Sequence, residues 1–219
     1  MTKKGFLIAF EGIEGCGKST QARMLADELI KRGNEVVLTH EPGATRIGEL
    51  IRRILLSVDN KDMDRFAELH LYLADRAQHL SEIIYPNYQS GKIIISDRYH
   101  LSTVAYQGYG RSINLDLIEH LHSSLPFFII PDITFIFDIS IEESFRRTTQ
   151  RITENHQEQW SRFEEEKRIF HEKIKEGFYR TQQNNPEFIK LINGNRSRDE
   201  IFKELLVYLE PLGLYNYGK

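Results

Sequence analysis

The sequence has little cysteine and no long apolar run. Its single cysteine, Cys16, cannot form a disulfide within one chain, which fits a reducing compartment, so we expect a cytoplasmic protein. No apolar stretch approaches the roughly 18 residues that span a bilayer, and we expect no membrane partner. The short apolar run that follows Lys3 and Lys4 has no cleavage-like end, so a signal peptide is not expected.

The chain also lacks an excess of charge of either sign. It carries 29 Lys and Arg against 32 Asp and Glu, a net charge of −3 among 219 residues. This balance gives no reason to expect a nucleic-acid partner, and a phosphorylated ligand must instead be met by local positive charge. No internal repeat or Gly/Ser linker divides the chain, so we expect a single domain over residues 1–219.

Apolar segments alternate with amphipathic ones along the chain. Five short segments are apolar throughout and predict buried strands, at 6–10, 36–38, 93–95, 133–137 and 188–192. Helical periodicity predicts helices at 22–30, 47–55, 64–85 (before Pro86), 114–124, 141–152, 160–183 and 198–209. This order is typical of an α/β fold whose parallel five-stranded sheet is flanked by helices on both faces. The charge-dense segment 153–168 is interpreted as a mobile, solvated excursion.

The segment FEGIEGCGKSTQ, residues 10–21, contains the spacing G-x-x-x-x-G-K-[ST] of a phosphate-binding loop. It follows a predicted strand and opens a predicted helix, as such a loop requires. Backbone N–H groups and the helix N-terminus would hold phosphate oxygens, while Lys18 would contact the outer phosphates and Ser19 a magnesium ion. The predicted ATP-binding residues are Gly12, Ile13, Glu14, Gly15, Cys16, Gly17, Lys18, Ser19 and Thr20.

Two further polar segments follow predicted strands. Asp97 and Arg98 come after the strand 93–95, where a carboxylate suits magnesium and a guanidinium suits phosphate. The turn that contains Pro42 follows the second strand and precedes Arg52. Ligands of open α/β sheets bind at the carboxyl ends of strands, so we expect both segments near the loop. Helix capping and a plain strand-to-helix connection are the alternatives.

The predicted long helix places Tyr72 and Arg76 on one face, where they could stack on a base and hydrogen-bond its edge. Burial in the core is the alternative for that face. Small hydroxyls and an amide follow Asp97 in the segment 102–108. Arginines gather around the polar excursion, at positions 146, 147, 151 and 162, with a solvated basic helix as the alternative.

These motifs together resemble the bacterial thymidylate kinase family. The loop above, HEPGAT, LHLYLADR, ISDRYHLSTVAYQG and SRFEEEKRIFHEKI follow the family order collinearly from about residue 6 to 174. The resemblance implies a P-loop NTPase fold with a small mobile lid, at about 146–162. It implies transfer of the γ-phosphate of ATP to dTMP, giving ADP and dTDP in dTTP synthesis. It also implies Mg²⁺ as cofactor and a homodimer.

The resemblance assigns residues to the dTMP site. Glu14 would accept a hydrogen bond from the 3′-hydroxyl, and Tyr106 would crowd the 2′ position. Tyr72 would stack on thymine, and Arg76 would reach its O4 atom. The remaining acceptor-site residues are Thr103 and Gln107 near the pairing edge of the base, Arg98 and Arg52 at the phosphate, and Pro42 and Ser102.

The resemblance also implies a catalytic arginine, which members carry either in the loop or in the lid. Residues 13–16 contain no arginine, so the lid should supply it, with Arg151 as first candidate and Arg147 as second. The predicted catalytic residues are thus Lys18, Asp97, Arg98, Arg151 and Arg147, with Ser19 and Asp97 at the metal. Two alternatives stay open: a kinase for another nucleotide such as dUMP, and a regulatory module that binds nucleotide without turnover.

Overall fold

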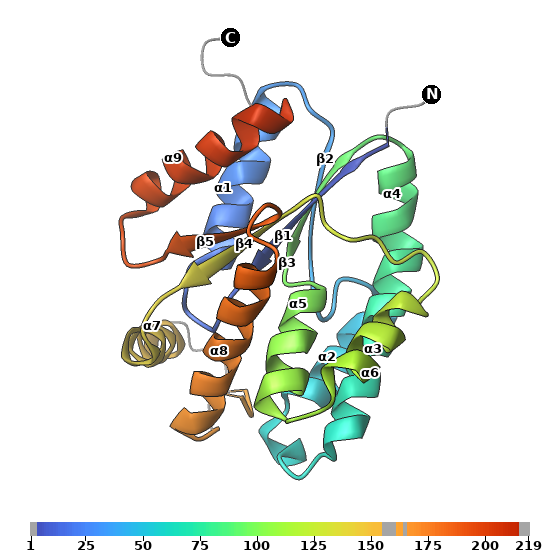
Figure 1. The fold of residues 1–219 in the computed structure, drawn as a ribbon, viewed down its shortest axis with the longest axis vertical. Coiled ribbons are helices and arrows are strands. Elements are labelled where there is room, and N and C mark those ends of the chain that lie inside the picture. Colours follow the sequence, from blue (N-terminus) through green and yellow to red (C-terminus); the bar gives the residue numbers. More distant parts are fainter. Residues whose placement is uncertain (1–3, 155–160, 164–165, 215–219) are drawn as a thin grey trace.

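The computed structural model describes residues 4–154, 161–163 and 166–214. Its five strands form one parallel sheet in the order β2-β3-β1-β4-β5 (Figure 1). The strands are β1 (Phe6–Glu11), β2 (Val36–His40), β3 (Ile93–Asp97), β4 (Ile133–Asp138) and β5 (Ile189–Asn193). The predicted parallel five-stranded sheet is therefore confirmed, with each strand within two residues of its expected bounds.

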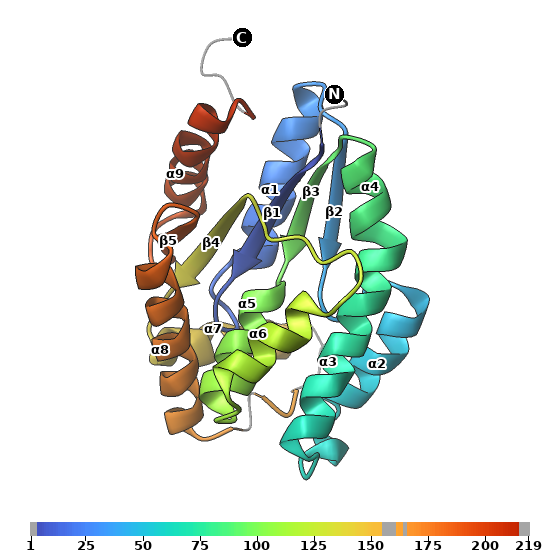
Figure 2. The same cartoon turned by 45° about the vertical axis from the view of Figure 1, so that its right-hand side comes forward.

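Helices cover both faces of this sheet (Figures 1 and 2). Helices α1 and α9 lie on one face, and α4, α5 and α8 lie on the other. The α-helices are α1 (Lys18–Lys31), α2 (Arg46–Leu56), α3 (Arg65–His79), α4 (Tyr85–Gln89), α5 (His100–Thr103), α6 (Leu115–Ser123), α7 (Ile141–Glu154), α8 (Arg168–Asn184) and α9 (Arg198–Leu209). Two π-helical turns, Leu80–Ile84 and Val104–Gly110, continue α3 and α5.

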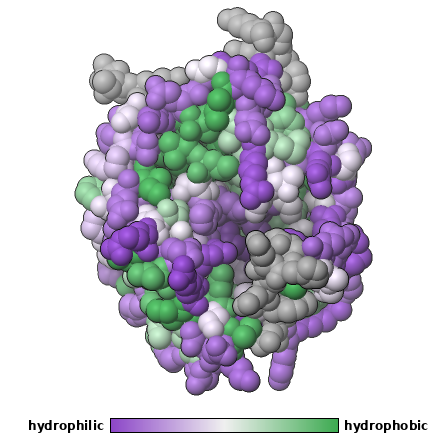
Figure 3. Space-filling view, turned by 180° about the vertical axis from the view of Figure 1, so that it is seen from behind, coloured by the Kyte–Doolittle hydropathy of each residue, from purple (hydrophilic) through white to green (hydrophobic). Residues whose placement is uncertain are grey.

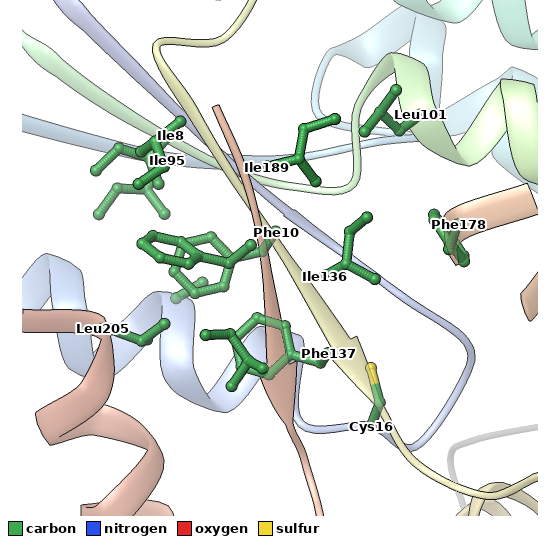
Figure 4. Packing of buried hydrophobic residues seen from close by; sticks show 14 of the residues in the cluster. Ile8, Phe10, Cys16, Ile95, Leu101, Ile136, Phe137, Phe178, Ile189 and Leu205 are labelled. Carbon is green, nitrogen blue, oxygen red and sulfur yellow. The ribbon is translucent and has the colours of Figure 1, made fainter. Parts of the chain in front are cut away.

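The core follows from side chains that alternate between the two faces of each strand. Phe10 and Phe137 stack with ring centroids 5.4 Å apart on the face covered by α1 and α9, close to Leu205 (Figure 4). Leu7 and its neighbours on the other face pack against Leu80 in the π-helical turn after α3. Because both faces are buried, the strands contain few polar residues, as the sequence pattern predicts.

The strand register brings the chemistry-bearing segments to one edge of the sheet. In β1, Phe10 pairs with Asp97 of β3, and His40 of β2 pairs with the same residue. The loop 12–17 therefore leaves the central strand directly beside Asp97. The carboxyl ends of β1, β2 and β3 meet there, which is where ligands of open α/β sheets bind.

Three sequence-based expectations about helices were wrong. The long helix does not end before Pro86, because the π-helical turn Leu80–Ile84 leads directly into α4, and Pro86 lies in the first turn of α4. The segment 100–110, whose small and polar residues show no clear periodicity, is helical. The predicted helix 160–183 begins only at Arg168.

The excursion 153–168 is not fully solvated. Arg162 and Phe163 are each only 3% exposed, so the interpretation of the Arg162 side chain as a solvated basic group is wrong. Its charge is paired inside the protein, as described below. Residues 155–160 and 164–165 of the excursion, and with them part of the expected lid, lie outside the described residues.

Candidate active site

A cleft of about 1230 Å³ opens at the carboxyl ends of the strands. It exceeds the roughly 300–1,000 Å³ of a typical single-ligand pocket, so it has room for two nucleotide-sized molecules. Seen from behind Figure 1, the molecule is hollowed near its centre, and hydrophilic residues surround the hollow (Figure 3). All of the predicted site residues except Gly12 and Ile13 border the cleft.

The loop between β1 and α1 has the backbone that phosphate binding requires. Gly12 has φ 134°, and a Cβ atom there would lie 2.5 Å from the Phe137 carbonyl oxygen, so only glycine fits. Gly17 has φ 98° and leads into the first turn of α1. The Lys18 ammonium is buried and donates to the carbonyls of Gly12 (3.0 Å) and Ile13 (2.9 Å). The loop thus holds a fixed positive charge beside inward-facing N–H groups.

Two oxygen-bearing side chains meet at the start of α1. The Ser19 hydroxyl donates to the Asp97 carboxylate across 78 residues of sequence. A hydroxyl and a carboxylate are the oxygen ligands that Mg²⁺ accepts, and Mg²⁺ in phosphate sites usually takes only one or two of them from the protein. The described residues contain no group of three His, Cys, Asp or Glu side chains that could hold a metal alone. Ser19 and Asp97 therefore fit a magnesium ion that is completed by phosphate and water.

The loop carboxylate Glu14 forms an ion pair with Arg98. Arg98 Nη2 donates to Glu14 Oε1 at 2.8 Å, and the Tyr106 hydroxyl donates to the same oxygen at 2.7 Å. Arg98 also donates to the Gly12 carbonyl and to the Ser102 hydroxyl, both at 3.0 Å. Arg98 has φ 72°, a strained conformation for a residue with a side chain, and such strain is found where surrounding contacts define a site.

The second oxygen of Glu14 is available to a ligand. Glu14 Oε2 is buried and has no hydrogen-bond partner within the described parts of the chain. Burial alone raises the pKa of Glu14, but Arg98, Lys18 and the Tyr106 hydroxyl lower it below the ordinary value. The carboxylate is thus charged at neutral pH and offers one strong acceptor at the edge of the cleft.

The base-contacting face predicted on α3 holds a buried ionic network. Arg76 is 1% exposed and forms an ion pair with Glu41 at 2.7 Å. Its remaining N–H groups donate to Thr103 Oγ1 (2.8 Å), His122 Nε2 (2.7 Å) and the Tyr99 carbonyl (3.0 Å). A hydrogen bond to a bound base therefore requires Arg76 to share one of these donors.

Aromatic rings line the same half of the cleft. Tyr72 lies 6.5 Å from Phe163 between ring centroids, and Phe163 lies 5.6 Å from Tyr106. Arg52 donates to the Pro42 carbonyl at 2.8 Å, which places its guanidinium over the turn after β2. Burial is the main cause that raises the pKa of Tyr72, so its ring is a neutral apolar surface.

The arginines of α7 border the opposite half. Arg147 donates to the carbonyls of Gly15 (3.4 Å) and Gly194 (3.1 Å) and pairs with Glu143 at 2.5 Å. Arg151 lies one helical turn further and also borders the cleft. Both predicted cations are therefore near the phosphate loop.

Sequence reasoning missed the turn after β5 and one aromatic wall. Gly194, Arg196, Ser197 and Arg198 border the cleft beside the loop. The rule that ligands bind beyond strand ends could have found them, since β5 was predicted. Phe163 was missed because the charged residues around it suggested solvent exposure.

A buried carboxyl lies beneath the site. Glu11 is 0% exposed and accepts hydrogen bonds from the N–H groups of Tyr99 (2.9 Å) and Ser102 (3.1 Å) and from the Ser102 hydroxyl (2.5 Å). Burial raises the pKa of Glu11 to about 7, despite these bonds and the nearby Arg98.

The strand–loop–helix phosphate site, the Ser19–Asp97 pair and the second, aromatic half of the cleft define a P-loop phosphotransferase with an acceptor site. The thymidylate kinase family model matches residues 10–205. Thymidylate kinase of Maridesulfovibrio salexigens is 43% identical over 90% of this chain and 92% of its own length. That of Geobacter sulfurreducens is 41% identical over 87% and 90%.

A solved structure agrees with these sequences. The crystal structure of thymidylate kinase from Ehrlichia chaffeensis covers 94% of this chain and 99% of its own, at 32% identity and a TM-score of 0.75. The chain belongs to the thymidylate kinase family. Members of this family phosphorylate dTMP to dTDP with ATP. No helix in the described residues is long and apolar enough to cross a membrane.

Glu11 predicts how stability depends on pH. Its pKa rises from 4.5 in the unfolded chain to about 7 in the folded protein. The folded state therefore binds a proton more tightly, and the resulting stability is complete below pH 4.5 and is lost as pH rises through 7. Relative to Glu11→Gln, which does not titrate, the wild type should lose roughly 2–4 kcal/mol of unfolding free energy between pH 4.5 and 8.

Urea denaturation across this pH range measures the difference. Glu176→Gln, on the exposed side of α8, is the control and should follow the wild type. Parallel curves for the wild type and Glu11→Gln would show that Glu11 titrates normally.

Proposed function

We propose that the cleft of this chain transfers the γ-phosphate of ATP to dTMP, giving ADP and dTDP. The single observation that carries this proposal is the placement of Glu14. A charged loop carboxylate would repel ATP, but Glu14 borders the cleft beside Tyr106, and one of its oxygens has no hydrogen-bond partner in the described structure, so a sugar hydroxyl of the acceptor would donate to it. The loop thus serves both substrates, with N–H groups for ATP and one carboxylate for the acceptor.

The donor half is built around Lys18 and the loop. Backbone N–H groups at the start of α1 would hold the β-phosphate, and the Lys18 ammonium would move toward the outer phosphates. Ser19 and Asp97 would hold Mg²⁺, which supplies charge neutralisation between the β- and γ-phosphates. Cys16 is 1% exposed and packs beneath the loop, so we assign it no chemistry.

The acceptor half would orient dTMP for attack. Arg98 and Arg52 would hold the phosphate, because a guanidinium matches phosphate oxygens. Tyr72 and Phe163 form the apolar walls for thymine, and Thr103 and Gln107 border its pairing edge. Tyr106, held between Arg98 and Glu14, would crowd a 2′-hydroxyl, which favours a deoxynucleotide.

The catalytic cation would come from α7. Charge spreads over the phosphoryl oxygens during transfer, and a positioned guanidinium neutralises it. Arg151 stays our first candidate, because it borders the cleft at the end of α7 nearest the lid. Arg147 is the second, since its present donors are directed to the Gly15 and Gly194 carbonyls.

We also propose a homodimer in the cytoplasm. Helix α2 exposes Leu50 (49%) and Ile54 (46%), and Phe66 at the start of α3 is 39% exposed. These apolar side chains suit a two-fold contact through α2 and α3. Sedimentation velocity at micromolar concentration should show a dimer, and a monomer would remove this part of the proposal.

The activity is tested by a steady-state assay with ATP, Mg²⁺ and each nucleoside monophosphate. We expect turnover with dTMP, weaker turnover with dUMP, and none without Mg²⁺. Lys18→Met should lower kcat at least about 100-fold, the scale for one preorganised electrostatic group. Lys31→Met, at the exposed end of the same helix, is the matched control and should change nothing. Absence of turnover with dTMP, when another nucleoside monophosphate is phosphorylated, would contradict the proposal.

Glu14→Gln tests the acceptor role of the loop. The amide keeps the shape but loses the charge-assisted bond, which contributes roughly 1.5–3 kcal/mol. The kcat/KM for dTMP should therefore fall about 10- to 100-fold, while the KM for ATP changes little. Glu142→Gln, exposed in the first turn of α7, serves as the control. A raised KM for ATP with dTMP unaffected would place the carboxylate at the metal instead.

A further inference from the structure

We propose that Glu68 is a positioning residue of the acceptor site. It lies behind the residues that border the cleft, where it orients Gln107 directly and holds Phe163 in place through Arg162. This inference rests on the proposed function, because it concerns the pocket for the dTMP base. It adds a contact between α3 and residues 162–163 that sets the shape of that pocket.

Glu68 connects three parts of the chain. Its side chain is 0% exposed and accepts a hydrogen bond from Gln107 Nε2 at 2.6 Å. It also forms ion pairs with Arg162 at 2.7 Å and with Arg111 at 3.1 Å. A buried carboxylate is costly unless it is paired and hydrogen-bonded, and here both oxygens are occupied. Loss of one partner therefore disturbs the other two.

The contacts of Arg162 show why residues 162 and 163 lie here. Its Nε donates to the Leu55 carbonyl at 2.5 Å, and its backbone N–H donates to the Leu56 carbonyl at 3.2 Å. These are the last carbonyls of α2, which lack partners within the helix and carry partial negative charge. Arg162 thus fits between the end of α2 and Glu68, and its position fixes the residue that follows.

That residue, Phe163, forms a wall of the base pocket. The Arg162 guanidinium lies 4.5 Å from the Phe163 ring centroid. The ring packs against Tyr106 (5.6 Å) and Phe170 (6.2 Å) and lies opposite Tyr72 at 6.5 Å. Only Phe163 of this pair borders the cleft, while Arg162 supports it from behind. Loss of the ion pair with Glu68 would therefore widen the pocket on the side that faces Tyr72.

Glu68 also determines the orientation of the Gln107 amide. An ionised carboxylate only accepts hydrogen bonds, so the NH₂ group of Gln107 must face Glu68 and its carbonyl oxygen must face away. Gln107 borders the cleft, and the group that it offers to a base is thus chosen by a residue that the base does not touch. A neutral side chain at position 68 would allow the amide to turn.

Kinetics of Glu68→Gln and Arg162→Met separate positioning from general stability. We expect each variant to raise the KM for dTMP about 10-fold while the KM for ATP stays within about twofold. The double variant should be no worse than Glu68→Gln alone, because Arg162 acts on the pocket through its contact with Glu68. Leu209→Ala, which removes a buried side chain at the far end of α9, controls for lost stability and should not raise the KM for dTMP.

Limited proteolysis gives a second measurement that does not depend on activity. Chymotrypsin should cleave after the buried Phe163 slowly in the wild type and several-fold faster in both variants. Cleavage after the exposed Phe127 and Phe188, followed by mass spectrometry in the same digest, should be unchanged. Arg162→Lys keeps the charge but loses the planar guanidinium, so it should give smaller changes in the same direction. This variant tests the inference even if Glu68→Gln does not fold.

Two results would overturn the inference. One is an unchanged KM for dTMP with unchanged protection of Phe163, and the other is an equal rise of both KM values as in a merely destabilised protein. Failure of the proposed function would give a different result, namely a wild type without turnover of dTMP. The proteolysis comparison would still test the Glu68–Arg162 contact in that case.

Discussion

The ion pair between Glu14 and Arg98 is the contact on which the arrangement of the cleft depends. It joins the phosphate loop to the segment after β3, and Tyr106 and Ser102 take their positions from it. Arg98 also offsets the carboxylate charge in the loop by binding one of its oxygens, while the other oxygen has no partner in the described structure. Under the proposed function, this one pair of side chains would separate the ATP half of the cleft from the acceptor half.

Around that pair, the structure holds buried carboxylates that are fully engaged by donors. Glu11, Glu41 and Glu68 are each buried and surrounded by donors. Glu14 by contrast keeps one oxygen without a partner in the described structure. Buried networks of this kind are rigid when complete, so they hold the surface groups in position before any ligand binds.

Much of this arrangement could be predicted from sequence, because its signals are local. Strands buried on both faces are apolar throughout, so the sheet was predicted correctly. A phosphate loop needs fixed glycine spacing, so its position at the edge of the sheet could be predicted as well, while the role of its residues stays a prediction. The partners of buried charges could not be predicted in this way. Arg162 and Glu68 lie 94 residues apart, and nothing near Arg162 in sequence distinguishes it from a solvated arginine. The helical segment 100–110 was missed because its residues serve the site and not a periodic apolar face.

The full engagement of Arg76 limits how this position can change over evolutionary time. Its planar guanidinium serves Glu41, Thr103, His122 and the Tyr99 carbonyl from three nitrogen atoms. A lysine would keep the positive charge but would offer three donors from a single atom, too few and too close together for four separate acceptors. Exchange between basic residues, harmless on most protein surfaces, would here leave at least one buried acceptor without a donor. Change at position 76 therefore has to be accompanied by change in the side chains around it.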